Sequence, residues 1–290
     1  MGSLTVKWRR LLRRSAAFFW GLAIAGTALK CLANGEMAAM GKERLSYGSV
    51  APWALAGVSR EAYESFEFFW KSFEAEPHGG NFAIPRKVIW LNGAPGAGKG
   101  TNTHYAQDVF QIKAEPIVTS DLLDSPDFQK EKDAGQLIGD REVTAIVFRT
   151  LLSRPYADGA LVDGYPRTAV QAECVKLLHD KIVAMKQTSD FHLVLLEISE
   201  EMSVDRQLGR GARAERNNAQ VRATGRGREV PIRPTDTDPE AARHRYQVYV
   251  EQTAAAVDVL KKYFPCHRVN AEGSFDRVRA NVYAIGRPKK

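Results

Sequence analysis

The chain has 290 residues, of which 44% are hydrophobic and 26% are charged, and its formal net charge is +7. This composition is typical of a soluble globular protein with one sizeable core or two small ones, and no repeat of solenoid period is present. Six basic residues and no acidic residue fall within 1–33, so the rest of the chain carries only +1. The high charge therefore belongs to one end, and we expect no nucleic-acid partner.

Residues 1–33 form a leader that we leave out of the fold. A basic stretch, KWRRLLRR, precedes a mostly apolar run at 16–29, which is shorter than the roughly 20 residues that a membrane span needs. The pattern indicates a targeting segment, with a weak membrane anchor or an unused upstream start codon as alternatives. The expected compartment is the cytoplasm or, for a transit peptide, an organelle interior. Membrane contact is expected only through this leader, if it is retained.

Residues 34–85 form an N-terminal extension, whose first part, 34–58, is rich in Gly and Ala and predicts a linker. The spacing in 59–76 predicts a helix with Ser59 at its N-cap. An aromatic stripe recurs there at three- and four-residue intervals, through Phe66, Phe69, Trp70 and Phe73. We expect this stripe to pack on the core, and a docking surface for a partner is the alternative.

From residue 86 onwards, short apolar strands alternate with helices. Strands are expected at 87–93, within 115–123, and at 159–164, 192–199 and 266–270. Helices are expected at 103–110, 140–154, 169–187, from 200 to about 210, at 238–264 and at 274–285, with an irregular Gly- and Arg-rich stretch up to Pro234. This alternation predicts an α/β fold: a five-stranded parallel sheet with helices on both faces.

The segment GAPGAGKGT, residues 93–101, follows a predicted strand and opens a predicted helix. Glycines allow backbone N–H groups to turn inward and form an anion nest, and the helix N-terminus adds partial positive charge. Lys99 supplies a full charge for the outer phosphates, and Thr101 places a hydroxyl near Mg²⁺. The sequence therefore predicts a phosphate-binding loop.

A second polar segment, DGYPRT, follows the strand expected at 159–164. Asp163 ends this strand beside the loop, where it can orient water bound to Mg²⁺. Arg167 can direct a fork of donors at a phosphate, and a structural ion pair with Asp163 is the alternative. Gln171, one helical turn on, suits the edge of a base or a structural hydrogen bond.

The loop, with Gly100 between Lys99 and Thr101, resembles that of the adenylate kinase family of nucleoside monophosphate (NMP) kinases. Four further stretches continue the resemblance in order, and a fifth closes it: TSDLL at 119–123, DAGQLIGDREV at 133–143, LVDGYPRTAVQAE at 161–173, VDRQLGR at 204–210, and RPTDTDPEAARHRYQVY at 233–249. The resemblance covers about 86–285. It implies a P-loop kinase core over 86–288, with a small NMP-binding insert at about 119–143 and a mobile lid at about 211–235.

The resemblance also implies roles for individual residues. The cations that would carry catalysis are Lys99, Arg167, Arg206, Arg210, Arg233 and Arg245. ATP would be held by Gly96, Ala97, Gly98, Lys99, Gly100, Thr101, Arg206 and Arg210. The acceptor would be held by Thr119, Gln136, Ile138, Gly164, Arg167, Gln171, Arg233 and Arg245. Thr101 and Asp163 would bind Mg²⁺, mostly through water. Asp236 and Asp238 would fix the arginines of the lid.

Some positions depart from the family pattern. Asp124 stands where an arginine usually grips the acceptor phosphate, and Gln136 replaces a common lysine. The insert is short, and the lid lacks the usual hairpin residues. Its remaining arginines are expected to form a solvated, flexible loop, with a phosphate clamp as the alternative: Arg213, Arg216, Arg222, Arg226 and Arg228.

The expected reaction is transfer of the γ-phosphoryl group of Mg-ATP to an NMP, with AMP favoured. A kinase for another NMP is one alternative, and a nucleotide-binding sensor of low activity that works through 34–85 is another. ATP and Mg²⁺ are the implied cofactors. The family resemblance implies a monomer.

Overall fold

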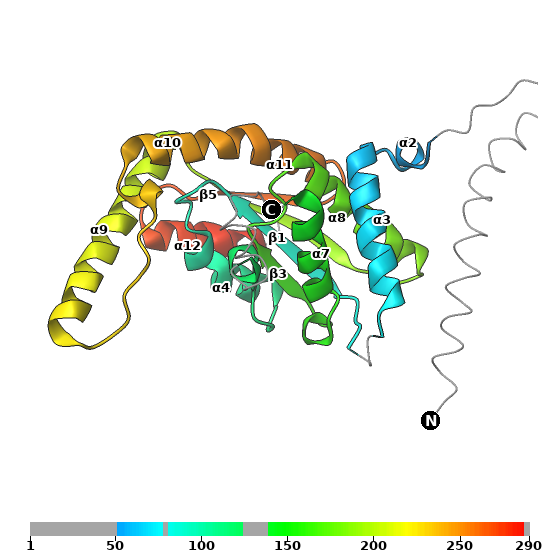
Figure 1. Ribbon diagram of the computed structural model, residues 1–290, viewed down its shortest axis with the longest axis horizontal. Coiled ribbons are helices and arrows are strands. Elements are labelled where there is room, and N and C mark those ends of the chain that lie inside the picture. The colour runs from blue at the N-terminus through cyan, green and yellow to red at the C-terminus, as the bar shows by residue number, and fades with distance from the viewer. Residues whose placement is uncertain (1–50, 78–80, 124–138, 287–290) are drawn as a thin grey trace, which may run out of the picture.

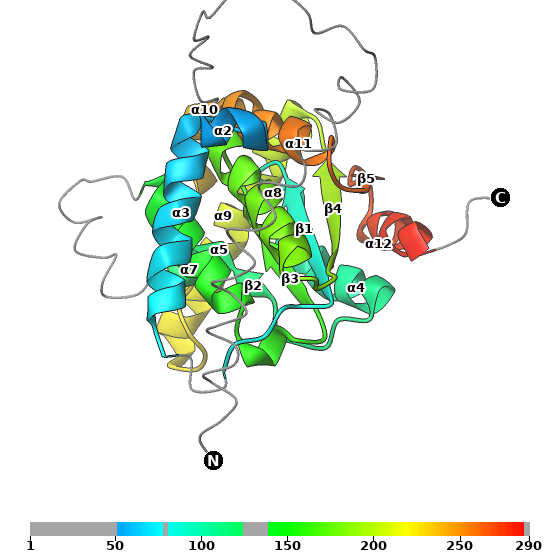
Figure 2. The ribbon, with the colours of Figure 1, turned by 90° about the vertical axis from the view of Figure 1, so that its right-hand side faces the viewer.

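A computed structural model describes residues 51–77, 81–123 and 139–286. Its centre is a sheet of five parallel strands (Figure 1), and their order, β2-β3-β1-β4-β5, can be followed in Figure 2. The strands are β1 Lys87–Gly93, β2 Ile117–Val118, β3 Ala160–Asp163, β4 Asp190–Glu197 and β5 Cys266–Asn270. The predicted five-stranded parallel sheet is therefore confirmed. Because β3 and β4 both pair with β1, the carboxyl end of β1 lies at the middle of the sheet.

Both faces of the sheet are covered by helices. Val88 and Trp90 of β1 point into one core layer, and Ile89 and Leu91 point into the other. The first layer is closed by α3 Arg60–Ala75, α7 Asp140–Leu151, α8 Ala169–Ala184 and α11 Ala254–Leu260. The second layer is closed by α4 Lys99–Phe110 and α12 Phe275–Tyr283. A strand that is buried on both faces has a nearly continuous apolar sequence. This is why apolar and polar residues do not alternate in β1.

The aromatic helix of the extension is part of this core. After the short α2 Pro52–Ala56, helix α3 begins beyond the N-cap Ser59, whose hydroxyl accepts a hydrogen bond from the backbone N–H of Ala62. Its aromatic stripe is buried against α7 and α8, alongside which the helix runs in Figure 2. The expected helix and its packing on the core are confirmed.

The segment expected to be irregular between 211 and 235 is largely helical, and this expectation was wrong. Helix α9 runs without a break through Glu200–Thr224 and ends at Gly225, after which the chain returns beside it to the single turn η3, Pro234–Asp236 (Figure 1). Asn218 holds the returning chain, because its side-chain amide donates to Val230 O at 2.8 Å and accepts from Val230 N at 2.7 Å. The three lid arginines at 213, 216 and 222 therefore lie on a helix.

Other boundaries differ slightly. Helix α4 starts at Lys99 rather than at 103, and the helix expected at 238–264 is α10 Pro239–Val248, a π-turn η4 Tyr249–Thr253 and then α11. The other short helices are α5 Thr119–Leu122, η2 Arg154–Tyr156 and η5 Ala284–Gly286. Over the described ranges, no helix is long and apolar enough to cross a membrane.

Candidate active site

The phosphate-binding loop leaves β1 at Gly93 and enters α4 at Lys99. Gly96 has a φ of 75°, and a Cβ at this position would lie 2.9 Å from the carbonyl oxygen of Ser203 on α9. Ser203 also donates a hydrogen bond from its hydroxyl to Pro95 O at 2.7 Å. The loop can therefore follow this path against α9 only with glycine at position 96.

The side chain of Lys99 folds back toward the first residues of the phosphate-binding loop. Its ammonium donates to the carbonyl oxygens of Gly93 at 2.6 Å and Ala94 at 3.1 Å. Burial lowers the pKa of Lys99 to about 8, although the carboxylate of Asp163 opposes the shift. A buried cation next to backbone N–H groups at a helix N-terminus favours a polyanion.

Asp163 ends β3 directly beside β1, where it pairs in register with Leu91. Burial raises the pKa of its carboxyl group, and Lys99 and Arg167 oppose the shift. Thr119, at the end of β2, donates its hydroxyl to the backbone oxygen of Asp163 at 2.9 Å. Three strand ends therefore meet at one edge of the sheet, as expected for parallel strands.

The turn at residues 164–167, which the sequence predicts to hold the acceptor and which we call the acceptor turn, follows Asp163. Its Arg167 donates from Nε to Gly164 O at 2.7 Å, which directs the guanidinium back over the turn. Asn92 of β1 joins this turn to the phosphate-binding loop: it donates to Pro166 O at 2.7 Å and accepts from Gly93 N at 2.8 Å. Asn92 was not among the predicted site residues, although a polar residue inside the run VIWLNG was a usable signal.

The arginines of the lid base gather near Lys99. Arg245 of α10 donates to Gln207 at 3.4 Å and to Thr235 at 3.3 Å. Burial lowers the pKa of Arg245 to about 10, and the charges of Arg233, Arg210 and Arg167 add to the shift. The charges of Arg167, Arg245 and Arg210 likewise lower the pKa of Lys99. Five of the six predicted cations thus share one electrostatic environment.

The sixth cation, Arg206, lies at the outer side of the loop. It donates to Gly96 O at 3.4 Å and to Gly273 O at 3.2 Å. Asp236, expected to fix an arginine, forms an ion pair with Arg210. Asp238 instead caps α10 by accepting from Glu240 N at 2.9 Å, so its expected role in holding an arginine is not observed.

Gln171 is buried behind the acceptor turn. Its amide oxygen accepts from the backbone N–H of Arg167 at 2.8 Å, and its amide nitrogen donates to Asp140 at 2.8 Å. Asp140 also accepts from the Thr168 hydroxyl at 2.7 Å. These are the structural hydrogen bonds that the sequence left as the alternative to a contact with a base, and they use one of the two N–H donors and one of the two lone pairs of the carboxamide. Asp140, on the first turn of α7, was not singled out in the sequence.

Similarity to known proteins agrees with this arrangement. The family model described as "Adenylate kinase" matches residues 91–264. An adenylate kinase of Xanthomonas campestris pv. campestris (strain B100) is 34% identical over an alignment of 207 residues. The alignment covers 68% of this chain and 98% of that protein. An adenylate kinase of Novosphingobium aromaticivorans is 31% identical over 217 residues, covering 68% of this chain and 97% of its own length.

This chain belongs to the adenylate kinase family. It is a P-loop phosphotransferase of the NMP kinase class, a class that uses ATP with Mg²⁺. The family resemblance drawn from the sequence is therefore confirmed. The matched range begins inside β1, so helix α3 lies outside it.

Three further residues of the adenylate kinase loop have defined surroundings. Ala97 is buried and donates its N–H to Ala94 O at 3.1 Å. A Cβ at Gly100 would meet no atom within 4 Å, and Thr101 is exposed on the first turn of α4. Three other positions named in the sequence analysis lie outside the described residues: Asp124, Gln136 and Ile138.

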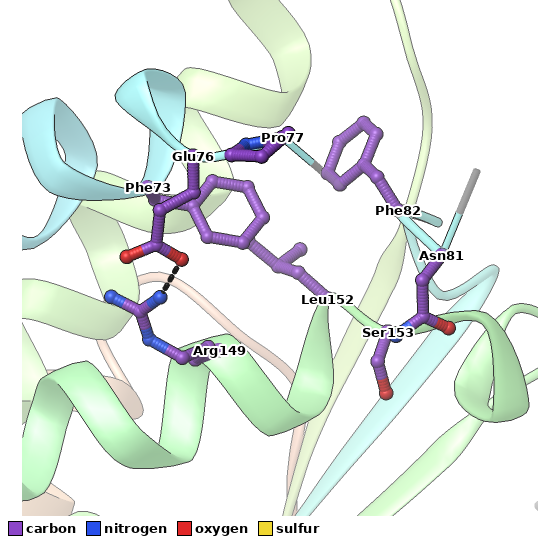
Figure 3. Close-up of a pocket in the computed structure, with 8 residues that line it drawn as sticks. All are labelled: Phe73, Glu76, Pro77, Asn81, Phe82, Arg149, Leu152 and Ser153. Carbon is purple, nitrogen blue, oxygen red and sulfur yellow. Dashed lines mark hydrogen bonds and ion pairs between the residues drawn. The ribbon is translucent and has the colours of Figure 1, made fainter. Parts of the chain in front are cut away.

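A separate pocket of about 200 Å³ lies between the end of α3 and α7 (Figure 3). Its lining is Phe73, Glu76, Pro77, Asn81, Phe82, Arg149, Leu152 and Ser153. Arg149 is engaged in an ion pair with Glu76. The pocket shares no residue with the phosphate-binding loop or the acceptor turn, so it is a different feature from the candidate active site.

Proposed function

We propose that the chain transfers the γ-phosphoryl group of Mg-ATP to AMP, giving two molecules of ADP. The observation that carries this proposal is the convergence of Lys99, Arg167, Arg210, Arg233 and Arg245 on the edge of the sheet where the phosphate-binding loop and the acceptor turn meet. Two polyanions repel one another, and a cluster of cations on both sides of the transferred group offsets that repulsion.

The donor nucleotide, ATP, would bind at the phosphate-binding loop. The backbone N–H groups of residues 96–101 and the N-terminus of α4 would surround its phosphates, with Lys99 and Arg210 adding charge. The close approach of the loop to α9 at Gly96 supports this assignment, because it leaves main chain rather than side chains to line the nest. Arg206 would hold the donor from the outer side.

Mg²⁺ would lie between Thr101 and Asp163. Both side chains carry oxygen atoms, which Mg²⁺ prefers as ligands. Most of the contacts between the ion and these side chains would run through water molecules. The ion would neutralise charge on the phosphates between which the bond is cleaved. The proximity of Lys99 to Asp163, evident from their mutual influence on pKa, supports a site next to the donor phosphates.

The acceptor would occupy the side of Thr119, Gly164 and Arg167. Arg167 would hold the acceptor phosphate, and Gln171 would offer its remaining N–H and lone pair to the base. By family resemblance, Gln136 and Ile138 would contribute to the same side. Arg233 and Arg245 would bridge the two nucleotides.

In the transfer step, an oxygen of the acceptor phosphate forms a bond to the γ-phosphorus as the bond from that phosphorus to the β,γ-bridging oxygen breaks. The leaving ADP keeps the electron pair, and no side chain has to move a proton. The protein contributes positioning and charge. Closure of the lid, residues 211–235, would exclude water as a competing acceptor. The family resemblance implies a monomer, and we propose that the chain acts as one.

The test is a steady-state assay of ADP formation from Mg-ATP with AMP, CMP, UMP, GMP and dTMP as acceptors. The proposal predicts a kcat/KM for AMP at least about 10-fold above every other acceptor. Lys99→Ala should remove transfer while leaving the thermal unfolding midpoint within a few degrees. Preference for another monophosphate would reassign the acceptor, and absence of transfer to any of the five would reject the phosphotransferase reaction.

A further inference from the structure

Helix α3 is connected to the acceptor turn by a row of three aromatic rings. Phe69 of α3 packs edge-on against Phe148 of α7, with ring centroids 5.5 Å apart and planes at 74°. Phe148 packs in the same manner against Tyr165 of the turn, at 5.9 Å and 76°. All three side chains are fully buried. Interiors are close-packed, so a ring at one end cannot shift without moving the next.

Tyr165 is fixed at its far end as well. Its hydroxyl shares a hydrogen bond with Thr144 of α7 at 2.9 Å and donates to the backbone oxygen of Gln171 at 3.4 Å. Its ring also lies 5.8 Å from that of Trp90 in β1. The backbone of the turn that presents Arg167 is thus set by a side chain that is held on three sides.

Both ends of α3 are tied to the neighbouring helices, one to α8 and the other to α7. At the first end, the backbone N–H of Ser59 donates to Glu173 of α8 at 2.9 Å, and Cys174 donates its thiol to Ala62 O at 3.4 Å. At the other end, Arg149 of α7 forms the ion pair with Glu76 that Figure 3 shows. Helix α3 therefore links α7 to α8 over its full length.

We propose that α3 is a positioning element for the acceptor side of the site and that it acts through Phe69, Phe148 and Tyr165. The helix lies outside the range matched by the family model, yet it supports the two helices that carry Asp140 and Gln171. The inference rests on the proposed function. It predicts that damage to the row raises the KM for the NMP more than the KM for ATP, because Tyr165 belongs to the turn that carries Arg167.

The test compares Phe69→Leu with Phe73→Leu in the full chain. Both changes shrink one buried ring of α3, but Phe73 packs against Phe69, Trp70 and Phe82 within the extension. Phe69→Leu should raise the KM for AMP by about 3- to 10-fold and leave the KM for ATP within about 2-fold. Phe73→Leu, one ring further from the turn, should lower the thermal midpoint comparably, raise the KM for AMP by less than Phe69→Leu does, and leave the KM for ATP within about 2-fold.

A second variant and a second measurement test the inference further. Tyr165→Phe, which removes one hydroxyl from the row, should also raise the KM for AMP selectively, and it carries the kinetic test if Phe69→Leu does not fold. Amide hydrogen exchange in 164–171 should become faster in Phe69→Leu and Tyr165→Phe, and less so in Phe73→Leu. Equal changes in both KM values, or exchange that is the same in all variants, would overturn the inference.

The exchange measurement needs no turnover, so it separates this inference from the proposed reaction. If the unmodified chain forms no ADP from AMP, the proposed reaction fails while the exchange result still decides the role of α3. If ADP forms normally and the variants show no selective effect, only the role of α3 is rejected.

Discussion

Arg210 on α9 and Asp236 in η3 form a forked ion pair at the base of the lid. The guanidinium Nε lies 3.1 and 3.2 Å from the two carboxylate oxygens, and a second nitrogen of the group contacts one of them. The backbone N–H of Arg233 also donates to Asp236 at 3.4 Å. One carboxylate therefore holds the guanidinium of Arg210 and the backbone at Arg233.

Removing the charge of Asp236 should disturb both arginines. Asp236→Asn keeps the size of the side chain but leaves Arg210 without its partner, and the expected loss in kcat/KM for ATP is about 10- to 100-fold. The unfolding free energy should fall by about 1–3 kcal/mol. Steady-state kinetics and urea unfolding measure the two effects, and unchanged kinetics would show that the pair does not orient Arg210.

Gly211 is required by the contact between α9 and η3. A Cβ at Gly211 would lie 2.0 Å from the backbone oxygen of Asp236, whereas a Cβ at Gly209 would meet only the end of the Arg213 side chain at 3.4 Å. Gly211→Ala should cost about 1–3 kcal/mol and reduce activity. Gly209→Ala, on the same helix, should stabilise the protein by up to about 1 kcal/mol. Equal thermal midpoints for the two variants would show that the close approach of α9 to η3 does not limit stability.

Raising the pH should weaken capture of ATP through Lys99. Burial sets the pKa of Lys99 near 8, so the free enzyme loses this charge as the pH rises through that value. We expect kcat/KM for ATP, which reports the free enzyme, to fall above about pH 8. The kcat profile should remain level to higher pH, because bound phosphates favour the charged lysine. A kcat/KM that stays level to about pH 9.5 would contradict this assignment.

Mild acid should destabilise the protein through His192. This ring shares a hydrogen bond with His267 at 3.2 Å, and burial lowers the pKa of His192, with Asp190 opposing the shift. The unfolded chain therefore binds more protons just below about pH 6.5, and the unfolding free energy should decrease as the pH falls from that value. His192→Asn should flatten this part of the curve in urea unfolding between about pH 5 and 7.5. The same slope in both proteins would assign the effect to other groups.

The sheet and the loop could be predicted because their signals are local. Apolar runs indicate β1, β3 and β4, and the position of Lys99 between a strand and a helix identifies the loop. The helix of the extension was equally clear, since its aromatic residues recur at helical spacing and form one face.

The lid could not be predicted, because its structure depends on contacts across the chain. Glycines at 209 and 211 disfavour a helix by propensity, yet Gly211 lies where η3 comes closest and Asn218 holds the returning chain. The bonds from Gln171 to Asp140 and from Asn92 to Pro166 also join distant segments. Spacing within one segment carries no information on such pairs.

The central claim is that two anionic nucleotides are held side by side, one through Lys99 and the other through Arg167. Calorimetric titration of Lys99→Ala and Arg167→Ala with Mg-ATP and with AMP, each alone, tests it most directly. We predict that Lys99→Ala loses at least about 10-fold in affinity for Mg-ATP and keeps its affinity for AMP, and that Arg167→Ala shows the reverse. If both variants weakened the binding of the same nucleotide to the same extent, the arrangement of donor and acceptor described above would be contradicted.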